Sequence, residues 1–186
     1  TAGRGIIHSE MPEQEHGRLA GFQLWVNLPA SDKLCDPAYH EYPKDQIPLE
    51  NRAQGVDVHV ITGVTHQGTT GPVCGVVTKP LYLDVSLCPE TSFQELIPQG
   101  HAGFVFVIEG EISVRSDTGS KSVSTRQLGV LGSGNAVHID SKASSARFLL
   151  VAAQVLHEPV ARYGPFVMNT HAEIEQAITD FNAGKF

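Results

Sequence analysis

Cysteine is scarce in this chain, and a long hydrophobic run is absent. The 186 residues include three cysteines, Cys35, Cys74 and Cys88, an odd number without the Cys-x-x-Cys spacing of metal or redox motifs. We therefore predict free thiols in a reducing, intracellular compartment. No apolar run approaches the roughly 20 residues that a membrane-spanning helix needs, which predicts a soluble protein without membrane contact.

Positive charge is also sparse. The chain has 13 Lys and Arg against 20 Asp and Glu, which gives a formal net charge of −7, and the basic residues are scattered. Phosphate backbones are bound through clustered positive charge, so we expect no direct nucleic-acid binding. Gly-Ser-Gly at 132–134 precedes a predicted strand instead of a helix, which argues against a phosphate-binding loop.

Glycine, proline and alternating hydrophobic residues dominate what the sequence does contain. Its 18 glycines and 11 prolines are typical of strands and turns rather than helices. Alternating or continuous apolar patterns predict strands at 21–28, 56–60, 81–87, 104–108, 112–116 and 147–155. Residues 112–116 are predicted to be the hairpin partner of 104–108. Many short strands with glycine turns predict an all-β sandwich or barrel.

The last residues follow a helical pattern instead. Thr170 and Glu173 have the spacing of a capping box, in which a threonine and a glutamate satisfy the first backbone N–H groups of a helix. Apolar residues follow at helical spacing up to Phe181, and Gly184 stands at the expected stop. One amphipathic helix is therefore predicted at the C-terminal end.

A histidine and a carboxylate lie two residues apart near the start of the chain. His8 and Glu10 follow a glycine turn, Gly3-Arg-Gly5, on a short apolar strand. Side chains at i and i+2 of a strand share a face, so both can hold one metal ion, and this ligand set suits non-haem iron or manganese. The alternative is a hydrogen-bonded His–Glu pair at a strand end. Ile6 and Ile7 predict dry surroundings, where an unpaired carboxylate is costly.

These residues belong to a longer motif. The segment from Thr1 to Pro12, Thr-Ala-Gly-Arg-Gly-Ile-Ile-His-Ser-Glu-Met-Pro, resembles the metal-site signature of the pirin family. The resemblance continues in Gly21–Pro29, Pro37–Glu41, Ile47-Pro48, Leu81–Asp84, Glu158-Pro-Val and Gly164–Thr170. It therefore covers nearly the whole chain.

The resemblance implies a fold and a ligand set. Pirins are bicupins, two tandem antiparallel β-barrels with one metal in the first, and His8 and Glu10 would be two of its four protein ligands. The metal implied is iron (Fe²⁺ or Fe³⁺), with manganese as the alternative. The family's other two ligands come from an earlier His-Pro-His segment, and no His-x-His occurs here. The expectation is that the chain starts within the first barrel and that, by itself, it can lack the metal.

The resemblance also implies a division of the chain. Residues 1–29 would be the remnant of the first, metal-binding barrel, and 30–55 a connector with at most one short helical turn. Residues 56–160 would form the second cupin barrel, a double-stranded β-helix or jelly roll, and 161–186 the tail and helix. Strands at 6–9 and 21–28 would lack neighbours, and because exposed strand edges promote association, we expect self-association or instability.

The second barrel lacks the ligands of a cupin metal site. Such sites need a His-x-His run and a Glu before the Glu-Gly turn, and a His in a later glycine-turn strand. Before Glu109-Gly110 the sequence offers Glu95 and His101 at the wrong spacing. The later ligand position falls on Val137, and a shift of one residue puts His138 on the opposite face. A metal-free second barrel is therefore expected.

Two classes of function follow from the resemblance. Pirins act as nuclear iron-binding co-regulators that bind transcription factors, with the redox state of the iron switching the binding surface. Pirin relatives also include flavonol (quercetin 2,3-) dioxygenases, whose substrate is a small flat aromatic molecule. Trp25 and Tyr82 could line a pocket for it, but packing in the core or between the barrels is the favoured interpretation of these two rings. A metal-free scaffold is a third possibility. We favour the regulatory role, in the nucleus and cytoplasm, because half of the ligands are missing and an acidic chain suits a protein partner.

Overall fold

The computed structural model describes residues 1–9, 16–17, 19–53 and 55–186. The chain divides into two compact units. Unit 1 consists of Thr1–His40 and Leu156–Phe186, and unit 2 is the continuous stretch Glu41–Val155. Within the described ranges, no helix has the length and apolar character needed to cross a membrane.

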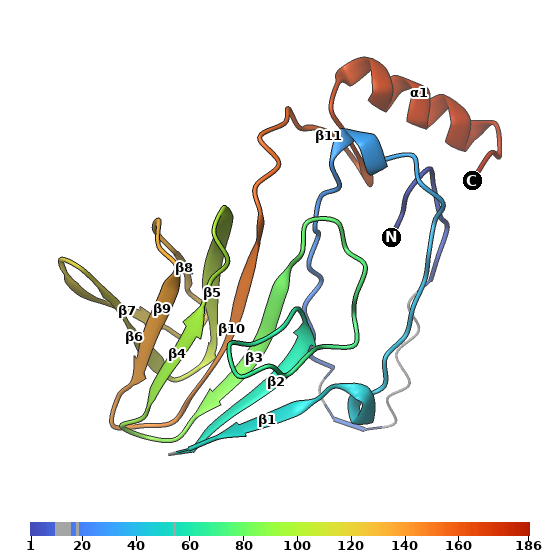
Figure 1. The fold of residues 1–186 in the computed structure, drawn as a ribbon. Coiled ribbons are helices and arrows are strands. Elements are labelled where there is room, and N and C mark those ends of the chain that lie inside the picture. The colour runs from blue at the N-terminus through green and yellow to red at the C-terminus, as the bar shows by residue number, and fades with distance from the viewer. Residues whose placement is uncertain (10–15, 18, 54) are drawn as a thin grey trace. The chain divides into compact units, whose positions relative to one another are not determined.

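Unit 2 is built from two antiparallel sheets arranged as a barrel (Figure 1). The six-stranded sheet has the order β1–β2–β3–β10–β5–β8, and the four-stranded sheet has the order β4–β9–β6–β7. The strands are β1 (Leu49–Arg52), β2 (Val56–Thr62), β3 (Leu81–Leu87), β4 (Ser92–Leu96), β5 (His101–Glu109), β6 (Glu111–Ser116), β7 (Gly119–Ser124), β8 (Leu128–Val130), β9 (Ala136–Ser141) and β10 (Ala146–Gln154). The predicted all-β barrel is confirmed.

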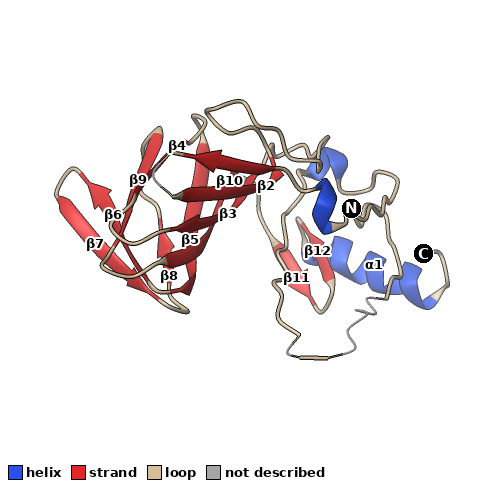
Figure 2. Cartoon of the chain, turned by 90° about the horizontal axis from the view of Figure 1, so that it is seen from below, coloured by secondary structure: helices blue, strands red, loops and turns tan. Residues whose placement is uncertain are grey.

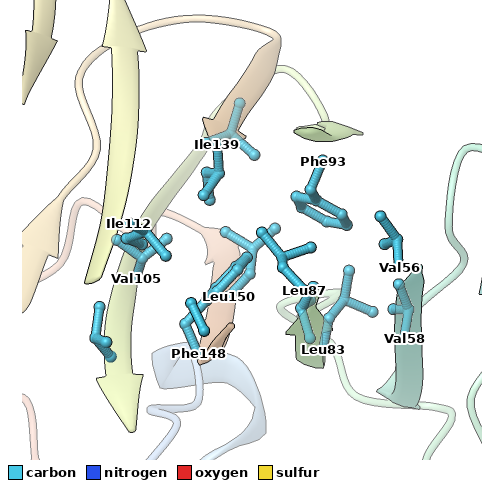
Figure 3. Packing of buried hydrophobic residues seen from close by; sticks show 14 of the residues in the cluster. Val56, Val58, Leu83, Leu87, Phe93, Val105, Ile112, Ile139, Phe148 and Leu150 are labelled. Atoms are coloured by element: carbon cyan, nitrogen blue, oxygen red, sulfur yellow. The ribbon is translucent and has the colours of Figure 1, made fainter. Parts of the chain in front are cut away.

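Alternating residues on facing strands fill the space between these sheets. In β2 and β3 every second residue is buried, as the alternation predicted. Phe93 on β4, Ile139 on β9 and Leu87 on β3 gather in this interior (Figure 3), each at most 2% exposed. Phe93 also meets Phe148 edge to face, with ring centroids 5.7 Å apart. Each buried side chain of this size contributes about 1.5–3 kcal/mol, so the core holds the two sheets together.

A glycine turn sends the chain from one sheet into the other. The sequence predicts a hairpin between 104–108 and 112–116, but β5 pairs with β10 and β8, whereas β6 pairs with β9 and β7. Between them Gly110 has φ +78°, and a Cβ there would lie 2.3 Å from the carbonyl oxygen of Ser145. The hairpin prediction is wrong because alternation specifies a strand's buried face and not its partner.

Unit 1 contains the helix α1 (His171–Asn182) beside a two-stranded ladder of β11 (Ala161–Tyr163) and β12 (Phe166–Met168) (Figure 2). The capping box is confirmed, because Thr170 accepts from the N–H of Glu173 and the Glu173 carboxylate accepts from the N–H of Thr170 at 2.7 Å. Gly184 follows the helix with φ +67°, as the predicted stop requires. The aromatic rings of Phe166 and Phe181 lie 6.1 Å apart and join α1 to β12.

Two strands predicted near the N-terminus do not form. Residues 6–9 and 21–28 are not part of any strand. Leu24 and Val26, which would share one face of a strand at 21–28, are 38% and 40% exposed. A strand needs a neighbour for its backbone N–H and C=O groups, and an alternating pattern by itself does not provide one.

The predicted connector holds more structure than one helical turn. The 3₁₀ turn η1 (Ala30–Asp32) lies in unit 1, and η2 (Lys44–Gln46) lies in unit 2. The strand β1 follows η2 and pairs with β2, so that part of the connector belongs to the barrel wall. The division into 1–29, 30–55, 56–160 and 161–186 stays a prediction.

Candidate functional site

A braced glycine turn precedes His8 in unit 1. The N–H of Arg4 donates to the carbonyl oxygen of Cys35 at 2.9 Å, and its guanidinium pairs with Asp36 at 2.5 Å. Gly3 has φ +52°, and a Cβ there would lie 2.2 Å from the same Cys35 oxygen. The turn therefore requires glycine at this position and is held against residues 35–36.

His8 is the predicted metal ligand that the structure describes. Its side chain is exposed, and its ring centroid lies 6.1 Å from that of Tyr39. Glu10 lies outside the described residues, so the shared face of His8 and Glu10 stays a prediction. The predicted dry surroundings are wrong, since Ile7 is 71% exposed and Ile6 is half-buried.

A buried ion pair joins the edges of the two sheets in unit 2. β1 is an edge of the six-stranded sheet and β4 an edge of the four-stranded one. From β1, Arg52 donates to the carbonyl oxygen of Gln94 at 2.7 Å and to Oε2 of Glu95 at 2.6 Å. The same guanidinium lies 4.9 Å from the ring centroid of Phe93, a cation–π contact. Side-chain bonds from Arg52 thus close this seam of the barrel.

Glu95 is the most deeply buried charge of this seam, with no exposed side-chain surface. Its Oε1 accepts from the N–H groups of His66 and Leu96, at 2.7 and 3.1 Å, and lies 3.0 Å from His66 Nδ1. A buried carboxylate without donors is costly by several kcal/mol, so these partners explain how it is tolerated. The signal in the sequence was a carboxylate at 95 between two apolar residues of one strand face, Phe93 and Ile97.

Glu50 is the second carboxylate of the seam. Its Oε1 accepts from Arg52 Nε, and its Oε2 accepts from the Thr65 hydroxyl, each at 2.5 Å. Burial opposes ionisation of Glu50, but hydrogen bonds from Thr65, Thr69 and Arg52 outweigh burial and hold its pKa below the ordinary value. We call Glu50, Arg52, Thr65, His66 and Glu95 the seam network. It sets two carboxylates against one guanidinium.

The seam network lies beside the position that a cupin metal ligand would occupy. Glu95 is directly opposite Val137 in the β4–β9 ladder. Val137 is 4% exposed and His138 is exposed, as the one-residue shift predicted. His101 is engaged elsewhere, with Nε2 2.9 Å from the carbonyl oxygen of Lys79. Among the described residues, no three His, Cys, Asp or Glu side chains are arranged to hold a metal ion.

A shallow groove lies over the four-stranded sheet. It is lined by Ser92, Phe93, Gln94, Arg115, His138 and Asp140. Arg115 donates two hydrogen bonds to Asp140, each at 2.6 Å, and Ser92 donates a third at 2.6 Å. The Arg115 bond is the main cause that lowers the pKa of Asp140. The two opposite charges neutralise each other here, which gives the groove little attraction for a charged ligand.

The two aromatic residues considered as substrate contacts have other surroundings. Trp25 is 51% exposed, and the guanidinium of Arg162 lies 4.7 Å from its ring centroid. Tyr82 is half-buried on β3, and burial, together with Asp84, raises its pKa. A role of either ring in substrate binding stays a prediction.

The facing antiparallel sheets of unit 2 define the cupin class of β-barrels. A crystal structure of quercetin 2,3-dioxygenase from Acinetobacter baumannii has the same fold, with a TM-score of 0.78 and 32% identity over 87% of this chain and 55% of that chain. The family described as Pirin matches residues 1–26, and the Pirin C-terminal cupin domain matches residues 82–186. The chain belongs to the pirin family.

Full-length relatives share this similarity from end to end of the chain. A pirin-like protein of Caulobacter vibrioides is 45% identical over 185 residues, and human pirin is 40% identical over 186 residues. A Pseudomonas aeruginosa protein provisionally named quercetin 2,3-dioxygenase is 40% identical over 187 residues. The chain spans 65%, 63% and 65% of these three relatives, respectively.

Proposed function

We propose that the protein is a metal-dependent pirin that cleaves a flavonol of the quercetin type with oxygen, and that His8 and Glu10 bind the metal. The observation that carries this proposal is the similarity, in sequence and in fold, to proteins named as quercetin 2,3-dioxygenases. This chain covers 55% of the matched A. baumannii chain, so the activity of a whole protein of that length is part of the proposal.

The donor chemistry near the N-terminus fits this metal. Imidazole nitrogen and carboxylate oxygen are ligands that iron and manganese share. His8 would supply the nitrogen from the braced turn at Gly3, and Glu10 the oxygen. A bound ion of this kind supplies a Lewis acid that polarises and orients an oxygen-bearing substrate. Because metal ligands must be deprotonated, the affinity of such a site for its ion would fall as the pH is lowered.

Oxygen uptake with quercetin tests the proposal. The protein is expressed from its gene, loaded with Fe²⁺ or Mn²⁺ without oxygen, and assayed in an oxygen electrode while bound metal is counted by mass spectrometry. Loss of a residue that only hydrogen-bonds to a metal ligand costs about 10–100-fold in metal affinity or activity. We expect His8→Ala, which removes a ligand itself, to reduce metal binding and oxygen uptake by more than this. His171→Ala, at the exposed start of α1, is the matched control and should retain both.

A second candidate is the co-regulatory role, in which the metal-loaded protein binds a transcription factor. The observation that favours it is that three arginines are already engaged within the protein. Arg115 and Arg147 are each paired with an aspartate, at 2.6 Å, and Arg52 is buried. Such a surface suits a protein partner better than a phosphate backbone. The same experiment separates the two candidates, because metal binding through His8 without oxygen uptake contradicts the dioxygenase and leaves the binding role.

A further inference from the structure

The glycine turn before His8 has a second long-range contact within unit 1. Gly5 has φ +139°, and a Cβ on it would lie 2.4 Å from two carbons of the Phe186 ring. This is closer than a real Cβ can approach, so the aromatic ring packs directly against the backbone of the turn. Gly5 precedes His8 by three residues. The contact therefore joins the segment after α1 to the backbone that leads to the predicted metal ligand.

The position of Phe186 is set by the segment that follows α1. The N–H of Gly184 donates to the carbonyl oxygen of Phe181 at 3.0 Å, and Gly184 has φ +67°, which ends the helix and redirects the chain. Phe186 is half-buried, and its ring centroid lies 6.1 Å from that of Phe166 on β12 and 5.9 Å from that of Phe181 on α1. Two neighbouring rings thus support the ring that packs against the turn.

The turn at Gly5 depends on such contacts for its order. Glycine lacks the Cβ that restricts φ and ψ, so it does not fix its own backbone. The N–H of Gly5 donates to the carbonyl oxygen of Ala2 at 3.0 Å, a bond within the turn itself. Contacts with distant segments include the bond from Arg4 to Cys35 and the ring of Phe186. A ligand that is held in its bound geometry beforehand loses less conformational freedom when the ion binds, which raises affinity.

We propose that Phe186 is a positioning residue of the predicted metal motif. Its ring holds the turn at Gly5 in one conformation and thereby orients the backbone that carries His8. This inference rests on the proposed function, since it takes His8 to be a metal ligand. It gives the segment after α1 a role in metal affinity, although Phe186 lies far from His8 in the sequence. Loss of the ring should loosen the turn and leave the ligand residue itself unchanged.

Removal of the ring, in the protein expressed from its gene, tests this proposal in two steps. The first step needs no metal. In Phe186→Ala, hydrogen exchange at the amides of Arg4 and Gly5, which are hydrogen-bonded in the turn, should be about tenfold faster than in wild type. The second step is a titration with Mn²⁺, read from the loss of the sharp electron paramagnetic resonance signal of the free ion. Its Kd should rise about tenfold, as for loss of a residue that supports a ligand.

Control variants make the result specific. Phe186→Tyr keeps the ring and should retain wild-type exchange and affinity. Phe181→Ala is the matched control, because it removes another ring of the same cluster without removing the one against Gly5. It should lower Tm as Phe186→Ala does, with smaller changes in exchange and affinity.

Gly5→Ala disturbs the same contact from the turn. Its Cβ must displace either the ring or the turn, so exchange should again be faster and Mn²⁺ affinity lower. Phe186→Ala should cost no further affinity in the Gly5→Ala background, because the contact is already broken there. An equal loss in both backgrounds would show that the ring does not act through Gly5. Gly5→Ala also supplies both readouts if Phe186→Ala does not fold.

The results separate the role of Phe186 from the proposed function. The role of Phe186 alone is wrong if His8→Ala loses the ion but Phe186→Ala leaves exchange or Mn²⁺ affinity unchanged, even where Tm falls. Both are wrong if His8→Ala binds Mn²⁺ as tightly as wild type. A metal-loaded wild type that takes up no oxygen with quercetin contradicts only the dioxygenase, because exchange and titration do not depend on catalysis.

Discussion

At the scale of single residues, the charged groups inside unit 2 are the part that local patterns describe least. Glu50 and Arg52 lie in a segment that we interpreted as a connector, and they become interior residues because β1 pairs with β2. His66 joins them from the loop that follows β2, where its N–H donates to Glu95 at 2.7 Å. In the sequence each of these residues looks like an ordinary solvent-exposed polar side chain, and only their convergence gives them a common role.

The lowered pKa of Glu50 predicts a definite dependence of stability on pH. A carboxyl group whose pKa is lower in the folded than in the unfolded state stabilises the fold above the unfolded value, and this contribution is lost as the pH falls through the folded value. The ordinary pKa of a glutamate, which represents Glu50 in the unfolded chain, is 4.5. We therefore expect the free energy of unfolding to fall on acidification below about pH 5, and less steeply in Glu50→Gln.

Urea unfolding, followed by far-ultraviolet circular dichroism at a series of pH values, measures this difference. Trp25 fluorescence is unsuitable, because Trp25 lies in unit 1. Glu175→Gln, an exposed change on α1, is the control and should follow the wild-type curve. Parallel curves for wild type and Glu50→Gln would show that Glu50 does not couple folding to protons.

For the metal ligands, a local motif predicts the residue types but not their surroundings. A conspicuous motif identified His8 and Glu10, and it is covered by the family match to residues 1–26. The motif did not predict the exposed surroundings of His8, because the exposure of its neighbour Ile7 depends on which residues pack around it. Sequence reasoning considered Glu95 only as a misplaced ligand, since the donors to Glu95 come from positions 52, 66 and 96.

At the scale of strands and helices, local patterns predicted the strands β2, β3, β5, β6 and β10 and the helix α1, but not how the strands pair. The strands predicted at 6–9 and 21–28 do not form. The capping box at Thr170 and the alternation in β2 and β3 involve neighbours in sequence, and the structure has both as predicted. In β5, by contrast, Val105 and Val107 face the core at 0% exposure, whereas Phe104 and Phe106 are half-buried on the other face. The two valines and the two phenylalanines are each spaced two residues apart, so the spacing alone does not indicate which pair faces the core.

The turn at Gly110 allows a test of the crossing between the sheets. Gly110→Ala and Gly75→Ala both place alanine at a positive φ, +78° and +75°, but the added Cβ meets the Ser145 carbonyl only in the first and has open space in the second. We expect Gly75→Ala to cost about 1–2 kcal/mol for the left-handed backbone. Gly110→Ala should cost about 1–3 kcal/mol more for the overlap. Urea unfolding measures both, and equal losses would mean that the close approach does not matter.

At the scale of the whole molecule, apolar surface is the notable property. Large apolar side chains near the N-terminus are exposed, among them Ile7 at 71%, Leu19 at 63% and Trp25 at 51%. Exposed apolar groups that lie close together mark interaction surfaces or association sites. The net charge of −7 opposes close approach of two copies at low salt, so the balance between these effects depends on ionic strength.

This balance predicts self-association of the chain that increases with salt. We expect light scattering of this chain to show a rise in average mass with concentration at about 0.5 M salt, where the Debye length falls well below 10 Å. Leu19→Ser/Leu24→Ser should reduce the rise, because it removes apolar surface that other copies would cover. Leu128→Ser, an exposed change in unit 2, is the control. A constant monomer mass under all these conditions would contradict the prediction.

The sequence by itself was sufficient for the class of fold, the terminal helix and the family, because alternation, capping and short motifs are carried by residues close together in the chain. The tertiary structure decided which strands pair, which face of β5 is buried, and that residues 21–28 do not form a strand. It alone assembled Glu50, Arg52, His66 and Glu95 into one network. The physical reason is that hydrogen-bond partners and the burial of charge depend on distant segments, which no local pattern records.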